Sequence, residues 1–277
     1  MLHIHNGDSS ADTAAQSTIP GEHFAFREAL ITGPTPRGLS PVEWRRIRAK
    51  HLFDTYGVPL ERCAQELLDQ EEKLTTAHQH DEVVLWFEHD LFCQLLLIYL
   101  LNWFAQMERH PEALTLICIG EFTGKPNFKG LGELTPEELA SLFPTRQPVT
   151  PDQLKLATEA WKAYTAPAPT EIENLLENST ASLQFLNAAL QAHLRRFPST
   201  INGLGSVEST ALRLINDHVQ SFADLFSSFS DRNWVYGFGD AQLWLALKRI
   251  VDAPQPMLRL KDSGAGESPE RRDSARS

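Results

Sequence analysis

The sequence predicts an N-terminal α/β domain with an open, mostly parallel sheet and Rossmann-like layering, followed by a mainly α-helical region. Residues 83–87 and 114–119 are continuous apolar runs, which are typical of strands buried on both faces. The largely apolar segment 91–108 lies between them and predicts a buried helix. A strand, a helix and a second strand of this kind form a βαβ unit, whose strands run parallel.

The chain before this unit supplies further elements of the same domain. Short apolar stretches at 2–6 and 23–27 predict two strands, and residues 10–17 suit a helix between them. Ser40-Pro41-Val42-Glu43 is a capping box with proline at the first helical position, so we expect a helix from there to about residue 56. The spacing of apolar residues then predicts a helix over 60–77.

After the βαβ unit, helix starts replace strand patterns. Three capping boxes follow one another, beginning at Thr135, Thr150 and Thr170. A further helix is expected over 182–196, and no strand pattern interrupts this stretch. We therefore expect residues 133–197 to be helical.

The last part of the chain predicts a small winged-helix-like domain. Helices are expected over 206–217, 221–228 and 240–251, and an extended segment follows at 256–260. The tail beyond it is rich in Ser, Gly and charge, which is typical of disorder. The expected division is 1–132 for the α/β domain, 133–197 for the helical region, 198–260 for the winged-helix-like domain and 261–277 for a disordered tail.

Composition narrows the class of protein. The 277 residues carry a net charge of −11, which argues against a broad nucleic-acid-binding surface because phosphate contacts need clustered Lys and Arg. The most apolar stretch, 91–104, is shorter than the about 20 residues that span a bilayer, and no signal-peptide pattern opens the chain. Cys63, Cys93 and Cys118 form no C-x-x-C pair and are expected to be free thiols. These features predict a cytoplasmic protein without a membrane partner.

Polar residues follow each predicted strand, and they are the candidate site. In an open parallel sheet, ligands bind outside the carboxyl ends of the strands, where loops meet helix N-termini. Carboxylates gathered there repel one another unless they are dispersed, protonated or bound to a cation or a hydroxyl-rich ligand. We expect them to converge on one rim of the sheet. The residues after the strands are Asn6, Gly7 and Asp8, then Glu28, then Glu88, His89 and Asp90, then Glu121.

Each of these residues has more than one interpretation. Asp8 and Glu88 are candidates to hold Mg²⁺ together with the phosphates of a ligand, and an acid here could equally accept ribose hydroxyls. Asp8 and Asp90 also stand at helix starts, where a carboxylate caps the helix. His89 is a candidate general base beside Glu88 and Asp90, or a hydrogen-bonding partner of those acids.

Other motifs give weaker hypotheses. His3 and His5 share one face of a strand, but no third ligand has a matching spacing for zinc. Residues 120–125 resemble a phosphate loop, yet Pro126 stands where the Ser or Thr is needed, so only the lysines at 125 and 129 remain as anion contacts. In the last domain, basic residues at 195, 196 and 213 are the few that could contact DNA, and the aromatic residues at 234, 236, 238 and 244 are expected in the core.

Two motifs carry a family resemblance. Residues 2–8 (LHIHNGD) and 86–92 (WFEHDLF) together resemble a bacterial family known as domain of unknown function 1835. Residues 197–200 (FPST) look like the small C-terminal domain that often accompanies it. The resemblance covers most of the chain and implies its architecture, but the family brings no activity. Cys93 stands before Gln94 where the resemblance leads us to expect an acid.

The sequence thus leaves two classes of function. The first is an α/β protein that binds a small molecule or a nucleotide-like, phosphorylated ligand at the strand ends, as a hydrolase or transferase, with Asn6, Asp8, Glu28, Glu88 and Asp90 lining the pocket. The second is a regulatory or interaction protein whose C-terminal domain binds DNA or a partner. The charge does not favour nucleic acid.

Overall fold

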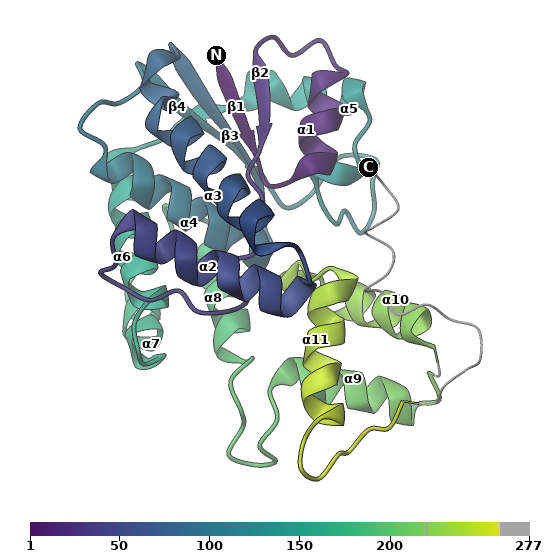
Figure 1. Cartoon of the computed structure of the whole chain (residues 1–277). Helices are drawn as coiled ribbons and strands as arrows, with labels where there is room; N and C mark the ends of the chain where they lie inside the picture. The colour runs from purple at the N-terminus through teal and green to yellow at the C-terminus, as the bar shows by residue number, and fades with distance from the viewer. Residues whose placement is uncertain (220, 261–277) are drawn as a thin grey trace.

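A five-stranded sheet forms the centre of the molecule in the computed structural model, which describes residues 1–219 and 221–260; the expected tail at 261–277 lies outside them. The strand order is β2-β1-β3-β4-β5, and helices cover both faces (Figure 1). The predicted α/β layering is therefore present. The strands are β1 (Leu2–His5), β2 (Glu22–Ala25), β3 (Glu82–Glu88), β4 (Ala113–Ile119) and β5 (Gln147–Pro148).

Four of the strands are parallel, as predicted. β1 lies between β2 and β3, and β3 pairs with β4 over its whole length, from Glu82 opposite Ala113 to Glu88 opposite Ile119. β5 runs antiparallel to β4, and the expectation that no strand interrupts residues 133–197 is wrong. This edge strand has two residues, one of them Pro148. A strand so short has no readable alternation, and proline is tolerated only at sheet edges.

Alternation along the strands separates two cores. Leu85 and Phe87 point to the face that α4 (Leu91–Gln106) covers, in the larger cluster. Val84 and Trp86 point to the opposite face, which α1 (Asp8–Ala15) and α5 (Pro136–Leu142) cover. Because successive strand side chains alternate between faces, Glu88 follows Trp86 onto the α1 side. The buried helix predicted between the strands is confirmed.

The capping boxes at Ser40, Thr135 and Thr150 all form. In each, the cap side chain accepts the backbone N–H three residues later, and the side chain of that later residue accepts the backbone N–H of the cap. The box predicted at Thr170 does not form: Thr170 is the first helical residue and Pro169 precedes it without a side-chain cap. These motifs therefore locate most of the helix starts. The remaining helices are α2 (Pro41–Tyr56), α3 (Leu60–Thr75), α6 (Pro151–Tyr164), α7 (Thr170–Leu176), α8 (Leu186–Leu194), α9 (Ser206–Asn216), α10 (Phe222–Arg232) and α11 (Asp240–Val251).

The helical part of the chain shares its core with the sheet. α6 and α8 both pack on α4, and the larger apolar cluster runs from Leu2 to Leu247 without a break at the expected boundaries. α9, α10 and α11 form the three-helix group below the sheet in Figure 1. Residues 256–260 are not a strand, so the expected wing is absent from the described residues. Among those residues, no helix is both long and apolar enough to cross a bilayer.

Candidate functional site at the carboxyl edge of the sheet

The carboxyl ends of β1 and β3 mark the place where the chain changes side. After β1 it enters α1 on one face, and after β3 it enters α4 on the other. In open α/β sheets this divergence opens a crevice at the strand ends, and ligands bind there. The crevice is where Asn6, Gly7 and Glu88 were predicted to meet.

Glu88 is the centre of a buried polar cluster. Its side chain is 5% exposed, and one carboxylate oxygen accepts the backbone N–H of Leu131. The thiol of Cys93 donates to the other oxygen at 3.5 Å, and the Asn6 amide donates to that sulfur at 3.0 Å. Ser10 in turn donates to the Asn6 carbonyl oxygen at 2.9 Å. The Leu131 backbone and the Cys93 thiol of α4 thus hold the carboxylate directly, and Asn6 with Ser10 of α1 holds the thiol.

Asp90 stands beside Glu88 as a second buried acid. It is the N-cap of α4 and accepts the backbone N–H of Cys93 at 2.9 Å, so the predicted capping role is confirmed. Atoms from Glu88, Asp90 and Cys93 all lie within 4.8 Å of one another. Cys93 belongs to the cluster although the sequence indicated only a buried thiol.

Burial and mutual repulsion favour the protonated forms of these groups. Burial and, to a smaller extent, the Asp90 charge raise the pKa of Glu88 to about 7, although hydrogen bonds from Leu131 and Asn6 oppose the shift. Burial likewise raises the pKa of Asp90, and it raises the pKa of the Cys93 thiol well above its usual range. A carboxyl with a pKa of about 7, as at Glu88, is half-protonated near neutral pH, as a general acid or base requires.

Two glycines allow backbone to approach these acids. A Cβ on Gly130 would lie 2.5 Å from a carboxylate oxygen of Glu88, and one on Gly237 would lie 2.2 Å from an oxygen of Asp90. Gly237 also has φ 60°, a conformation that favours glycine. Because Gly237 follows the η4 turn (Trp234–Tyr236), the C-terminal helical group closes directly over Asp90.

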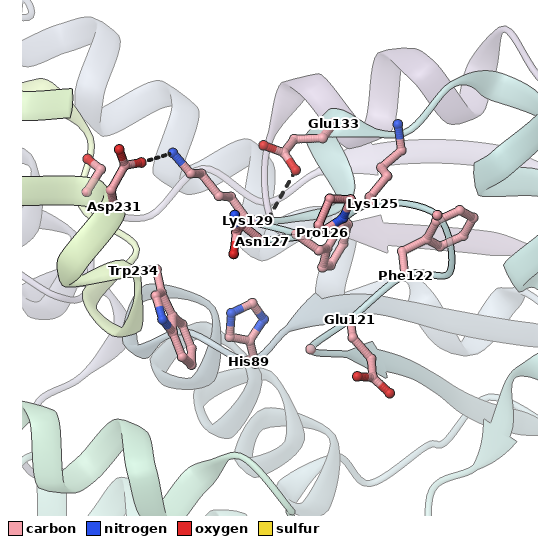
Figure 2. A pocket seen from close by; sticks show the side chains of 14 residues that line it. His89, Glu121, Phe122, Lys125, Pro126, Asn127, Lys129, Glu133, Asp231 and Trp234 are labelled. Atoms are coloured by element: carbon pink, nitrogen blue, oxygen red, sulfur yellow. Dashed lines mark hydrogen bonds and ion pairs between the residues drawn. The ribbon is translucent and has the colours of Figure 1, made fainter. Parts of the chain in front are cut away.

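His89 faces away from the acids, toward a ring of aromatic side chains. Trp234 lies with its ring centroid 4.6 Å away (Figure 2). Phe185 and Phe128 follow at 6.0 and 6.5 Å. Its Nδ1 is buried and has no hydrogen-bond partner among the described residues, so the role predicted between the two acids is not observed. Trp234 is 51% exposed, and the expectation that it belongs to the core is wrong.

Two clefts open at this edge and share Lys129 and Glu133 as walls. The larger, which we call the edge cleft, has a volume of about 1050 Å³ and includes His89, Glu121 and Trp234. The smaller, the switch-point cleft, has about 360 Å³. It is lined by Asn6, Gly7, Asp8, Ser9, Ser10, Glu88, Lys129, Gly130, Gly132 and Glu133.

Both lysines of the edge cleft are held by exposed or half-buried acids. Lys129 contacts Asp231 of α10 at 2.7 Å, and Lys125 contacts Glu138 of α5 at 3.1 Å. Figure 2 shows the Lys129 side chain reaching across the cleft to Asp231. Such pairs contribute about 0–1 kcal/mol, so an anionic ligand can replace the acid.

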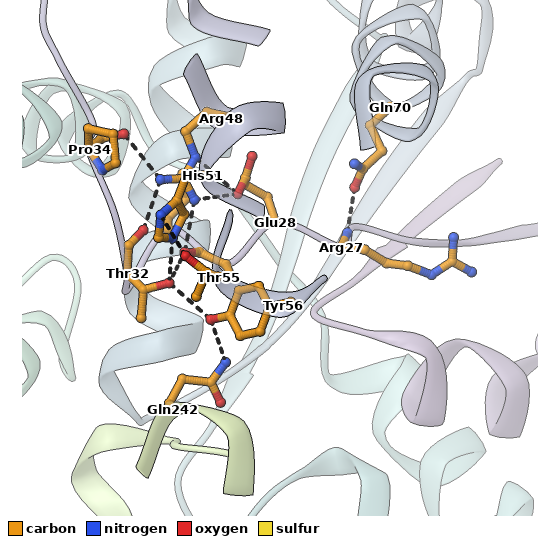
Figure 3. A network of polar contacts seen from close by, with 12 residues as sticks. Arg27, Glu28, Thr32, Pro34, Arg48, His51, Thr55, Tyr56, Gln70 and Gln242 are labelled. Atoms are coloured by element: carbon orange, nitrogen blue, oxygen red, sulfur yellow. Dashed lines mark hydrogen bonds and ion pairs between the residues drawn. The ribbon is translucent and has the colours of Figure 1, made fainter. Parts of the chain in front are cut away.

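Glu28 does not line either cleft. Its buried carboxylate contacts the guanidinium of Arg48 at 2.6 Å, and Arg48 also donates to the carbonyls of Ala29, Thr32 and Pro34 (Figure 3). The structure therefore does not bring Glu28 beside Glu88 in either cleft, and a buried cation from α2 neutralises it. Ligand binding by Glu28 stays a prediction. No spacing along the chain indicates this pair.

Asp8 lines the switch-point cleft but is half-exposed and paired with Arg27 at 2.5 Å. The cap of α1 is Gly7, so Asp8 is a first-turn acid and not the cap. Mg²⁺ on Asp8 and Glu88 fits the structure poorly: Asp8 has its own cation, and the groups nearest Glu88 are Asp90 and a thiol. Mg²⁺ takes oxygen ligands and water, whereas sulfur suits softer metals.

The histidines of β1 gain a third member that the sequence did not indicate. His23 of β2 stacks on His3 with centroids 4.5 Å apart, and its Nδ1 lies 3.1 Å from Nε2 of His5. His3 donates from Nε2 to Pro20, and its Nδ1 accepts the indole N–H of Trp86. With these nitrogens engaged, the cluster is a neutral hydrogen-bonded core. Among the described residues, only Glu88, Asp90 and Cys93 group at metal-binding distances.

Comparisons of the chain with protein-family models, curated proteins and solved structures found no match. The resemblance to domain of unknown function 1835 stays a prediction.

Proposed function

We propose that this protein binds a small phosphorylated ligand of nucleotide type across the two clefts, and that Glu88 exchanges a proton with it. The observation that carries the proposal is the buried Glu88 carboxyl. It lines the switch-point cleft and has a pKa of about 7. A group kept half-protonated at neutral pH in such a place is a candidate for acid–base catalysis. The reaction class is hydrolysis or group transfer.

The edge cleft suits the planar part of such a ligand. The exposed ring of Trp234 lies at 4.6 Å from His89, and Phe122 and Phe128 line the opposite wall. Aromatic faces stack on nucleobases with little dependence on the base. A wall that combines aromatic and polar side chains matches a base and its sugar better than it matches a lipid.

The switch-point cleft suits the phosphate. α1 begins there without a side-chain cap, so its first backbone N–H groups are free to donate. Lys129 stands where the two clefts meet and can exchange Asp231 for phosphate oxygens. Asp8 is the one acid in the first turn of α1, and Arg27 balances its charge.

Glu88 would then lie beside the bound phosphate, where it can take a proton from an attacking water. In hydrolysis, a water oxygen attacks phosphorus, the P–O bond to the leaving group breaks, and Glu88 takes the proton that the water loses. Asp90 raises the affinity of Glu88 for that proton, because a second negative charge nearby disfavours ionisation. Asn6 and Cys93 hold the carboxyl in place.

The test is ligand binding by calorimetry and thermal shift with ATP, ADP, ribose 5-phosphate and inorganic phosphate. At least one nucleotide is expected to stabilise the wild type. Lys129→Met should weaken that binding about tenfold, the usual cost of one charged hydrogen bond. Lys50→Met is the matched control, since Lys50 forms an exposed i,i+4 pair with Asp54 on α2.

Turnover separates binding from chemistry. Glu88→Gln should keep nucleotide affinity within about threefold and lower phosphate release by about 100-fold or more, the range of one general base. Loss of binding in Lys50→Met as well as Lys129→Met, or no stabilisation by any of the four compounds, would refute the proposal.

A further inference from the structure

A second pocket lies where the α/β part meets the C-terminal helices, and it shares no lining residue with the edge cleft. Its volume is about 460 Å³. One wall comes from Thr32 and from α2, and the other comes from the end of α8 with α9 and α11. Pockets of this size at the junction of two packed units are common ligand sites. We call it the junction pocket.

Arg196 is an under-paired cation in this pocket. Its guanidinium donates to the carbonyl of Ile31 at 2.8 Å, contacts Nδ1 of His193 at 3.3 Å and lies over the ring of Phe238. No carboxylate among the described residues lies within ion-pair distance of it. Burial lowers the pKa of Arg196, which shows how little solvent compensates its charge. A half-buried cation whose hydrogen bonds all go to neutral acceptors leaves a place for an anion.

Glu208 is an under-paired anion in the same pocket. Its Oε2 is buried and has no hydrogen-bond donor among the described residues. Its Oε1 lies 4.0 Å from Arg249, a residue whose side chain is 71% exposed. Glu208 lines the pocket, and one of its carboxylate oxygens therefore lacks a donor.

The rest of the pocket limits what can fill it. His193 is neutral, because burial and Arg196 lower its pKa to about 3, and it accepts from Arg196 through Nδ1. Thr32, His51 and Tyr56 satisfy one another in a closed network that extends to Gln242 of α11 (Figure 3). The remaining wall is apolar: Ile31, Val207, Phe238, Leu245 and Ala246.

We propose that the junction pocket binds a free α-amino acid with an apolar side chain. Its carboxylate would pair with Arg196 and with the more exposed Arg249, and its ammonium group would donate to the Glu208 carboxylate. The side chain would pack on the apolar wall around Phe238. A zwitterion satisfies both under-paired groups at once, whereas a simple anion would leave the Glu208 oxygen without a donor.

Thermal shift and calorimetry with the twenty L-amino acids, each at about 10 mM, would test this site, because that concentration detects even millimolar binding. An apolar amino acid is expected to stabilise the protein. Its methyl ester and its N-acetyl derivative, which each lack one charge, should bind at least about tenfold more weakly. Nucleotides should not compete, since the two sites share no residue.

Variants of the charged residues in the pocket assign the contacts. Glu208→Gln and Arg249→Met should each weaken the binding of the amino acid. Arg213→Met, at an exposed arginine of α9 outside the pocket, is the matched control and should leave binding unchanged. The proposal is overturned if no amino acid binds, if the blocked derivatives bind as well as the free compound, or if Glu208→Gln and Arg249→Met leave the affinity intact.

Discussion

Glu28 lies just after β2 and Glu88 is the last residue of β3; both are nearly fully buried, and both were predicted as site residues. Arg48 neutralises Glu28 within the protein and uses its other donors to hold three backbone carbonyls. Among the described residues no cation is paired with Glu88, whose neighbours are an amide, a thiol and another acid. A buried acid with a dedicated cation is a structural element, whereas a buried acid whose pKa lies near neutrality can give up and take back a proton.

The largest expected effect comes from breaking the neutralised acid. Arg48→Met leaves the Glu28 carboxylate buried and unpaired, and should lower the free energy of unfolding by about 3–5 kcal/mol in urea denaturation. Glu28→Gln combined with Arg48→Met should recover part of this loss, because no buried charge remains. If the double variant is as unstable as Arg48→Met alone, packing and not charge explains the effect. Lys50→Met, at an exposed ion pair, should change stability by less than about 1 kcal/mol.

Replacing Glu88 should change the free energy of unfolding in the opposite direction, toward higher stability. Glu88→Gln removes a carboxylate that burial disfavours, and should raise the free energy of unfolding by about 2 kcal/mol at about pH 8.5, where the wild-type group is ionised. At about pH 5 the wild-type carboxyl is protonated and the gain should vanish. A destabilised Glu88→Gln protein at the higher pH would show that the ionised group is stabilised by partners instead.

The wild type should lose stability as pH rises through about 7. The folded pKa of Glu88 lies above its ordinary value of 4.5, so this group costs no stability below about 4.5 and an increasing amount up to and past 7. Asp90 acts in the same direction. Urea denaturation across pH should show a falling limb in the wild type that is shallower in Glu88→Gln. An unchanged limb would assign the titration to other groups.

On the acidic side the histidines should dominate. Burial lowers the pKa of His3 to about 4 and those of His5 and His23 in the same direction, although Glu82 opposes the shift at His3. Their contribution to stability is complete above about 6.5 and is lost as pH falls toward the folded values. His3→Gln should reduce this loss by about 1–2 kcal/mol at about pH 4. No change in the acidic limb would exclude His3 as a titrating group.

The smallest expected change in stability compares the capping box at Ser40, which forms, with the one predicted at Thr170, which does not. Ser40→Ala removes a side chain that accepts the Glu43 N–H and should cost about 1 kcal/mol. Thr170→Ala should cost a few tenths at most, since Thr170 caps nothing. Thermal denaturation of both variants measures the difference. Equal losses would show that Thr170 stabilises α7 by another contact.

The sequence by itself determined the local structure of most of the chain. Continuous apolar runs predicted β3 and β4, and capping boxes predicted the starts of α2, α5 and α6, because both patterns depend on residues close together in the chain. The polar ends of β1 and β3 also followed from the sequence, since the carboxyl ends of parallel strands share one edge. β5 was missed because two residues carry no pattern.

Only the tertiary structure decided which polar residues work together. Arg48 neutralises Glu28, and Cys93 donates to Glu88. Trp234, which we expected in the core, lies beside His89 in the wall of the edge cleft. Each of these contacts joins residues from separate elements, and no spacing along the chain encodes them. Whether a buried carboxyl keeps its proton depends on the charges and dipoles within a few ångströms, which folding alone assembles.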